Sequence, residues 1–169
     1  EAGWLAALLE RMEREPSAAA IQSRIMLFDR RHLIQSAGGA MTWHGYGYDR
    51  GFWRRPQPPW SEAGEVFFAS AGAALYRRSA WDHVGPFDPE FFMYHEDVDW
   101  SWRAWLAGWR VLYEPASVIY HKMGATTSQV LGFSARQALG ERHRIRTLLK
   151  LGAWPAALRP ELPEGALVA

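Results

Sequence analysis

Strand-like and helix-like patterns alternate along this chain, and this alternation limits the available folds more than any other feature of the sequence. Strand-like patterns occupy residues 18–28, 33–36, 65–76, 109–113 and 117–120. Helical patterns, ended by Gly or Pro, occupy residues 3–15, 79–84, 97–107 and 134–151. Such alternation predicts an α/β fold. Pro115 is expected to break the chain between the last two strands.

One long stretch, residues 42–64, has neither the strand nor the helix period. It contains three prolines and the glycines Gly45, Gly47 and Gly51. The glycine spacing superficially suggests a phosphate-binding turn, but the dinucleotide fingerprint requires a preceding strand, a following helix and a different spacing. We therefore predict a long loop, and loops of this length in compact domains are usually functional or disordered.

Composition narrows the classes of partner and metal site. The 169 residues suit one domain, and 19 basic against 18 acidic residues give a net charge of +1, which provides no global attraction to nucleic acid or to an anionic membrane. The absence of cysteine excludes thiolate metal sites, so a metal would need carboxylate, imidazole or water ligands. No apolar run approaches the roughly 20 residues that span a bilayer. Most of the ten tryptophans are expected in the core.

An acidic cluster lies inside the most aromatic part of the chain. Glu96, Asp97 and Asp99 fall within four residues, beside Phe92 and Trp100. Helix capping and the helix dipole account for one such carboxylate. Three of them repel one another and are costly to bury, which indicates a site of perturbed pKa or a cation site. Asp97-x-Asp99 is a possible metal pair, although residues two apart on a helix do not share a face.

His121 follows the strand predicted at 117–120. A single histidine at the end of a strand is more often structural than a ligand. However, ligands in α/β proteins collect at the carboxyl ends of strands. His121 is therefore either a structural residue or a ligand.

Three runs in fixed order carry a resemblance to a known family: residues 68–88, 91–113 and 116–126. Together they resemble the carboxy-terminal half of a family 2 glycosyltransferase of the rhamnosyltransferase-like branch, with similarity over roughly residues 1–150. The resemblance implies a GT-A fold, with a mixed sheet flanked by helices, that here lacks the amino-terminal nucleotide-binding half. It also implies inverting transfer of a sugar from a nucleotide diphosphate donor to a glycan or lipid-linked acceptor in polysaccharide synthesis, with Mg²⁺ or Mn²⁺.

The resemblance also implies roles for individual residues. Asp97 matches the catalytic general base, and Glu96 would assist it. His121 matches a histidine that reaches the metal in several relatives. This match favours Asp97 as a base over an Asp97–Asp99 metal pair and gives Asp99 a structural role.

Six residues are assigned to substrate binding. Gly72 and Ala73 match small residues that let the backbone lie against donor or acceptor, and Asp49 belongs to a segment that resembles a covering loop. Tyr94, His95 and Trp100 complete the set through their places around the acidic cluster.

The resemblance also divides the chain. Residues 1–133 are expected to form the acceptor-side portion of a catalytic domain, 134–152 a basic helix and 153–169 a loose tail. The chain is expected to be a fragment that is inactive in sugar transfer when isolated. The implied enzyme is cytoplasmic, a location compatible with peripheral association at the inner face of the membrane, and it has no nucleic-acid partner.

Two alternatives come from other classes of protein. A non-catalytic carbohydrate-binding or interaction module would stack sugars on Trp43, Trp53 and Trp60. Such a module has no need of three adjacent carboxylates. A membrane or partner role for the 134–151 helix is less favoured, because its positive residues are spread around the helix.

Overall fold

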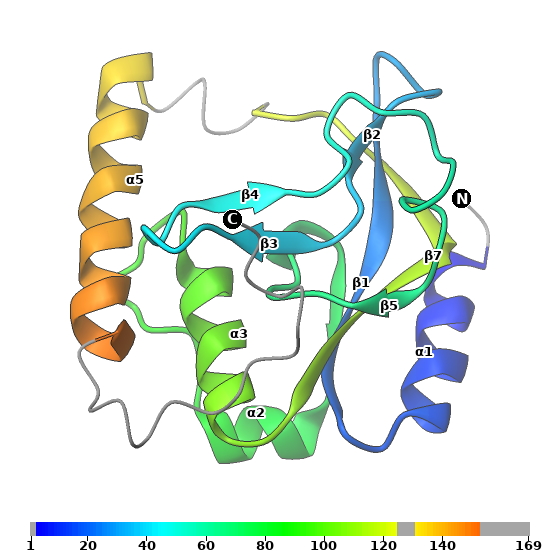
Figure 1. Ribbon diagram of the computed structural model, residues 1–169, viewed down its shortest axis with the longest axis horizontal. Coiled ribbons are helices and arrows are strands. Elements are labelled where there is room, and N and C mark those ends of the chain that lie inside the picture. The colour runs from blue at the N-terminus through cyan, green and yellow to red at the C-terminus, as the bar shows by residue number, and fades with distance from the viewer. Residues whose placement is uncertain (1–2, 125–130, 153–169) are drawn as a thin grey trace.

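The computed structural model describes residues 3–124 and 131–152, and it centres on one mixed sheet with the order β2-β1-β7-β5 (Figure 1). The central pair, β1 and β7, is parallel, whereas β2, β6 and β5 pair antiparallel at its edges. The strands of this sheet are β1 (Ala18–Leu27), β2 (Ile34–Ser36), β5 (Gly64–Glu65), β6 (Ala74–Tyr76) and β7 (Arg110–His121). A separate two-stranded sheet pairs β3 (Gly39–Met41) with β4 (Gly47–Asp49).

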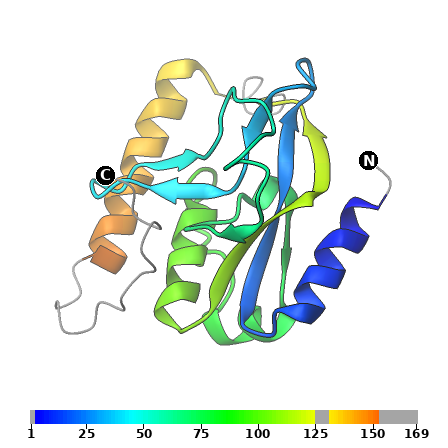
Figure 2. The ribbon, with the colours of Figure 1, turned by 45° about the vertical axis from the view of Figure 1, so that its right-hand side comes forward.

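Helices α1 and α3 cover opposite faces of the main sheet (Figure 1 and Figure 2). Because neighbouring side chains on a strand point to opposite faces, Ile21 and Leu112 pack with α1 while Ala20 and Val111 belong to the core on the other side. The helical elements are α1 (Trp4–Arg14), the short 3₁₀ turn η1 (Ala71–Ala73), α2 (Arg78–Val84), α3 (Glu96–Leu106), α5 (Phe133–Thr147) and its π-helical extension η2 (Leu148–Gly152). The predicted α/β class is confirmed.

The prediction that Pro115 breaks the chain between two strands is wrong, because β7 runs through it. The register along β1 shifts at this point: Ser23 lies opposite Glu114, and the next residue, Arg24, lies opposite Val118. The residues between Glu114 and Val118 therefore form a bulge without partners in the ladder. A proline is tolerated there because its missing N–H is not needed.

The long loop predicted at 42–64 contains an unforeseen strand. β4 pairs antiparallel with β3, and together they extend away from the main sheet toward α5 (Figure 1). Gly39 in β3 has the Phe68 ring packed directly on it, where a Cβ would collide. The predicted strand at 65–76 is correspondingly shorter than expected, because only its two ends enter the sheet. Neither segment has a pattern of its own, so the pairing depends on contacts distant in sequence.

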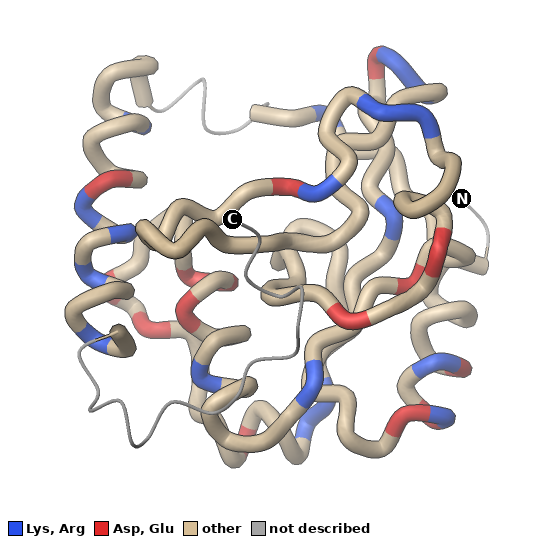
Figure 3. The backbone as a smooth tube through the Cα atoms, in the orientation of Figure 1, with Lys and Arg blue, Asp and Glu red and all other residues tan. Residues whose placement is uncertain are grey.

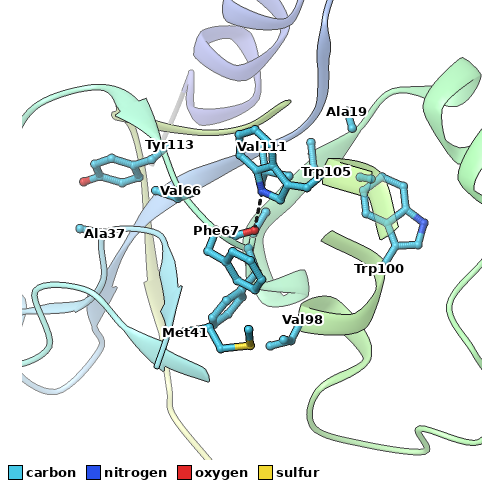
Figure 4. Packing of buried hydrophobic residues seen from close by; sticks show 14 of the residues in the cluster. Ala19, Ala37, Met41, Val66, Phe67, Val98, Trp100, Trp105, Val111 and Tyr113 are labelled. Carbon is cyan, nitrogen blue, oxygen red and sulfur yellow. Dashed lines mark hydrogen bonds between the residues drawn. The ribbon is translucent and has the colours of Figure 1, made fainter. Parts of the chain in front are cut away.

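Aromatic side chains fill the core between the sheet and α3 (Figure 4). Trp105 is almost fully buried, and its indole N–H donates to the Phe67 carbonyl at 2.9 Å. Trp100 is fully buried and stacks on Trp81 with ring centroids 5.5 Å apart. The expectation that tryptophan serves mainly in the core is confirmed for these residues.

The basic helix α5 uses its positive charges within the molecule. The Arg144 guanidinium lies 4.3 Å from the Tyr46 ring centroid, at the tip of the β3–β4 hairpin. Arg146 and Lys150 form ion pairs with Asp88, at 3.4 and 2.9 Å. These contacts hold α5 against the hairpin and against the loop that precedes α3. Among the described residues, no helix is long and apolar enough to cross a membrane. The predicted tail, 153–169, lies outside the described residues.

Candidate active site

The turn that leads into α3 carries the acidic cluster and is strained. Tyr94 and His95 both have left-handed backbone angles, with φ of 68° and 67°. Such angles cost non-glycine residues about 1–3 kcal/mol each and persist only where the surroundings hold them. The turn sets Glu96 and Asp97 at the first positions of α3.

His143 of α5 holds this turn from the side. Its Nδ1 lies 2.9 Å from both the Met93 and the Tyr94 carbonyl oxygens, and its ring packs edge-to-face on Phe91 at 5.1 Å. The side chain is only 1% exposed. No motif marks His143, so sequence reasoning missed it. The basic helix therefore supports the site instead of standing apart from it.

Asp97 is held by two backbone donors. Its Oδ1 accepts a hydrogen bond from the Val98 N–H at 2.9 Å, and its Oδ2 accepts one from the Ala71 N–H at 3.2 Å. Burial is the main cause that raises the pKa of Asp97 from its ordinary 3.8 to about 7, and the charges of Glu96 and Asp49 add to it, while the two N–H groups act in the opposite direction. A carboxylate with a pKa near neutrality suits general base chemistry.

We expect the raised pKa of Asp97 to appear in the pH dependence of stability. The folded chain binds this proton more tightly than the unfolded chain, so the contribution to stability is full below about pH 4 and is lost as pH rises toward 7. Asp97→Asn keeps the side chain neutral. Its melting temperature should match the wild type at about pH 3, below the unfolded pKa, and exceed it at about pH 8. Thermal unfolding of both proteins at both pH values measures this, and a difference that does not change with pH would contradict it.

Glu96 and His95 are also perturbed, in opposite senses. Burial raises the pKa of the Glu96 carboxyl, and Glu96 Oε2 is a buried atom without a hydrogen-bond partner among the described residues. Burial, followed by the neighbouring charges of His143 and Arg144, lowers the pKa of His95 to about 4. His95 is therefore neutral at pH 7. The next two residues in the chain, Glu96 and Asp97, are carboxyl groups whose pKa values are raised.

Asp49 links Asp97 with His121. It ends β4, where it is hydrogen-bonded to Ser36, and burial raises its pKa despite that bond and the charge of His121. The Asp49 charge in turn acts on Asp97. Three predicted site residues that lie far apart in the sequence, on β4, α3 and β7, are thus linked through the charge of Asp49.

A buried polar network that the sequence did not reveal supports this arrangement. His121 Nδ1 lies 2.9 Å from Gln35 Oε1. Gln22 Nε2 donates to Ser36 Oγ at 2.9 Å, and Gln22 Oε1 accepts the Ser70 N–H at 2.7 Å. Polar side chains at inward positions of β1 and β2 were the only available signal for this network.

Three other residues assigned to substrate binding lie in different environments. Gly72 is exposed in η1, and a Cβ there would find only Ser70 Oγ within 4 Å, so the space before it is open. Ala73 is 8% exposed and packs into the core. Trp100 is fully buried, and its N–H donates to the Gly85 carbonyl at 2.8 Å. Its assignment to substrate binding is corrected to a packing role, because no part of the side chain reaches solvent.

Asp99 has the structural role that was expected. Its carboxylate is fully buried, with Oδ2 2.9 Å from Arg103 Nε and Oδ1 2.9 Å from Lys150 Nζ. Arg103 also donates to the Val84 and Pro86 carbonyls, at 2.7 and 2.9 Å. Asp99 is thus committed to these two cations and does not pair with Asp97 around a metal.

The fit of a divalent metal depends on His121. The Gln35 contact orients the ring and leaves Nε2 for a ligand, an arrangement typical of metal-binding histidines. Within residues 3–124 and 131–152, however, no group of three or more His, Asp or Glu side chains could hold an ion. The described residues therefore offer part of a coordination sphere and do not complete one.

The tryptophans proposed for sugar stacking do not share one environment. Trp43 is 74% exposed, and Trp53 is also exposed. Trp60 packs against the core, and its carbonyl accepts the Tyr113 hydroxyl at 2.9 Å. Trp60 is therefore better described as a packing residue.

Several known proteins are similar to this chain. A family model described as glycosyl transferase family group 2 matches residues 2–160. N-acetylglucosaminyl-diphospho-decaprenol L-rhamnosyltransferase of Mycobacterium tuberculosis, in strains CDC 1551 / Oshkosh and ATCC 25618 / H37Rv, is 41% identical over 86 residues, which are 44% of this chain and 27% of that protein.

Among solved structures, the crystal structure of GalNAc-T7 with UDP, GalNAc and Mn²⁺ is similar, with a TM-score of 0.55 and 16% identity. The similarity covers 86% of this chain and 28% of that one. At this identity the likeness concerns the fold alone, and it confirms the expected mixed sheet flanked by helices. The chain spans little more than a quarter of the length of each of these proteins.

Proposed function

Because the chain belongs to glycosyl transferase family group 2 and is similar to a rhamnosyltransferase, we propose that it carries the acceptor side of an inverting glycosyltransferase site. The expected family and branch are confirmed. Inversion, the acceptor class and the role of each residue are proposals.

The observation that carries the proposal is the state of Asp97. This carboxyl has a pKa of about 7, is anchored by the Ala71 N–H and lies within electrostatic reach of Asp49. When ionised, it takes the proton of an acceptor hydroxyl. The hydroxyl oxygen then forms a bond to the anomeric carbon of the donor from the face opposite the nucleotide diphosphate, and the bond from that carbon to the diphosphate breaks. The proton remains on Asp97.

Other residues around Asp97 are proposed to tune this step and bind the substrates. The Glu96 charge raises the pKa of Asp97 and so keeps it basic near pH 7. Gly72, with open space before it, lies next to Ala71 and can admit a sugar ring close to the carboxylate. Tyr94 and neutral His95, which directly precede Glu96 and Asp97 in the chain, and Asp49, whose charge acts on Asp97, are proposed to bind the substrates. The strained turn held by His143 fixes the carboxylates in place.

The substrates are proposed from the relatives. The curated relative is an L-rhamnosyltransferase whose name specifies a decaprenol-linked acceptor. We therefore favour a nucleoside diphosphate rhamnose donor and a lipid-linked glycan acceptor. A cytoplasmic location is proposed from the family resemblance alone.

The direct test is a transfer assay with the complete protein. It is incubated with a panel of nucleoside diphosphate sugars and a lipid-linked acceptor, and the product linkage is determined by NMR. A product of inverted anomeric configuration is the expected result. A retained configuration, or hydrolysis without transfer, would overturn the proposal.

A divalent metal is proposed as a cofactor, with His121 as one ligand. When bound, Mg²⁺ or Mn²⁺ would neutralise the leaving diphosphate. GalNAc-T7 was crystallised with UDP and Mn²⁺. In the chain itself, Gln35 orients the His121 ring, and Asp49 lies close enough to interact with it electrostatically.

His121→Ala is expected to raise the Mn²⁺ concentration needed for half-maximal activity by about 10-fold or more, as changes around metal ligands do. A titration of activity against Mn²⁺ measures this shift. His83→Ala is the matched control, because His83 lies on α2 and contacts Trp109. Identical titration curves for His121→Ala and wild type would give His121 a purely structural role.

A carbohydrate-binding module is the second candidate, favoured by the high exposure of Trp43. It predicts glycan binding without nucleotide or metal, and loss of that binding in Trp43→Ala. A glycan array with both proteins tests it.

A further inference from the structure

Two exposed loops at one end of the molecule bring arginines and aromatic rings together. The Arg–aromatic patch consists of Arg30, Arg31, Phe52, Trp53, Arg54 and Arg55, all exposed. Figure 3 shows the two basic segments side by side, one after β1 and one after β4. The acidic site does not account for this surface, and the family resemblance implies peripheral membrane association without assigning it to any residues.

The two loops form one built surface. The Ile34 N–H donates to the Arg54 carbonyl at 2.8 Å, and the Trp53 N–H donates to the Ile34 carbonyl at 2.9 Å. The Arg30 guanidinium lies 4.6 Å from the Trp53 ring centroid, which joins the loops through their side chains as well. Because backbone bonds connect them, the arginines and aromatics of the patch are presented together.

Trp53 combines an unusual backbone angle with an exposed side chain. Its φ of 61° is left-handed, which is unusual for a bulky residue, and 47% of its surface remains exposed. Strain of this kind clusters at functional positions. Phe52 beside it is 43% exposed, so two large rings meet solvent at adjacent positions.

The patch carries four arginines, and one exposed carboxylate, Asp29, adjoins them in the chain. Among the described residues, none of its four guanidinium groups lies within ion-pair distance of a carboxylate. By contrast, Arg103, Arg110, Arg144 and Arg146 all have such partners. The patch thus offers unpaired positive charge beside exposed aromatic rings.

We propose that the Arg–aromatic patch docks the protein on an anionic lipid surface. Guanidinium groups bind phosphate in a bidentate manner, and basic side chains are attracted to anionic leaflets. Tryptophan and phenylalanine are suited to the boundary between headgroups and acyl chains. The whole chain carries a net charge of only +1, so the positive charge that would attract an anionic leaflet is local to the patch.

The position of the patch connects it with the candidate site. The Phe28 N–H donates to the His121 carbonyl at 3.0 Å, and the Arg31 guanidinium lies 4.8 Å from the Tyr120 ring centroid. The patch therefore adjoins the end of β7 that carries His121. This inference rests on the proposed function for its purpose, which is to bring the site to a lipid-linked acceptor.

Flotation of the complete protein with vesicles tests the proposal. Vesicles of phosphatidylcholine alone are compared with vesicles containing about one third phosphatidylglycerol, at about 0.1 M and about 0.5 M NaCl. Binding is expected only with phosphatidylglycerol and mainly at low salt. Since each basic residue near such a surface strengthens binding about fivefold, Arg30→Gln with Arg55→Gln should weaken it about 25-fold.

Two further variants sharpen the assignment. Arg14→Gln with Arg78→Gln removes the same charge from exposed positions on α1 and α2 and should bind as the wild type does. Trp53→Asn should weaken the binding that survives at high salt, because Asn tolerates a positive φ and only the ring is lost.

Several results would overturn the proposal. These are no binding, equal binding to both kinds of vesicle, equal losses in the patch and control variants, or tighter binding to a single-stranded oligonucleotide than to the anionic vesicles. The flotation assay contains neither donor nor acceptor. Its failure would leave the transfer reaction untouched, and failure of transfer would leave vesicle binding untouched, so the two proposals fail separately.

Discussion

Asp97→Asn is expected to lower kcat for sugar transfer by a factor of about 10²–10⁴, the contribution typical of a general base. Asn has nearly the same shape but cannot take the acceptor proton. Donor binding should survive, because the change affects the acceptor side of the reaction. Steady-state kinetics of the complete protein, together with calorimetric titration of the nucleotide sugar, measure both quantities. Unchanged turnover would remove Asp97 from the role of base.

The pH profile adds an independent readout. Because the pKa of Asp97 is raised to about 7, kcat of the wild type should increase as pH rises through that region. Glu96→Gln is the matched variant, since it removes the neighbouring charge that helps to raise the pKa of Asp97. In Glu96→Gln, the rise of kcat with pH should occur at lower pH than in the wild type. The loss of kcat should be smaller than in Asp97→Asn. A profile that does not move would show that Glu96 does not act on the base.

Asp99→Asn is expected to lower the free energy of unfolding by about 3 kcal/mol, because it leaves two cations beside a buried neutral group. Arg103 and Lys150 lie 2.9 Å from the two carboxylate oxygens of the fully buried Asp99. The partial exposure of both cations places the loss at the lower end of the range for broken buried ion pairs. Urea denaturation at neutral pH measures the change.

The chain contains its own control for this experiment. Arg78 and Asp82 form an ion pair with the same four-residue spacing and an Nε–Oδ1 distance of 2.8 Å, but on the exposed face of α2. Asp82→Asn should leave the midpoint of unfolding unchanged within error, since exposed pairs contribute little. Equal effects of the two substitutions would contradict the importance of burial at Asp99.

The site was predictable from sequence to the extent that its chemistry lies in short segments. Glu96, Asp97 and Asp99 stand out because three carboxylates among aromatic residues conflict with burial unless something compensates for the charge. The different roles of these three carboxylates became apparent only from the folded structure. The two cations that neutralise Asp99 come from its own helix and from η2, the extension of α5. The Asp97 carboxylate accepts backbone N–H groups instead and is influenced by further carboxylates.

Errors in the predicted site have one common cause. Trp100 is adjacent in sequence to the acidic cluster but points into the core, because neighbouring residues on a helix face different directions. His143 is remote in sequence from the cluster yet bonds to the carbonyls just before it. Distance along the sequence was therefore a poor guide to whether Trp100 and His143 belong to the site.

By itself, the sequence determined the α/β class, the approximate bounds of α1, α2 and α3, the candidate base Asp97 and the family. These properties follow from local periodicity and from motifs in fixed order. Only the tertiary structure decided the pairing of β3 with β4, the raised pKa of Asp97 and the electrostatic interaction of Asp49 with His121. Pairing and pKa depend on which distant segments exclude water from one another, and no single segment of the sequence contains that information.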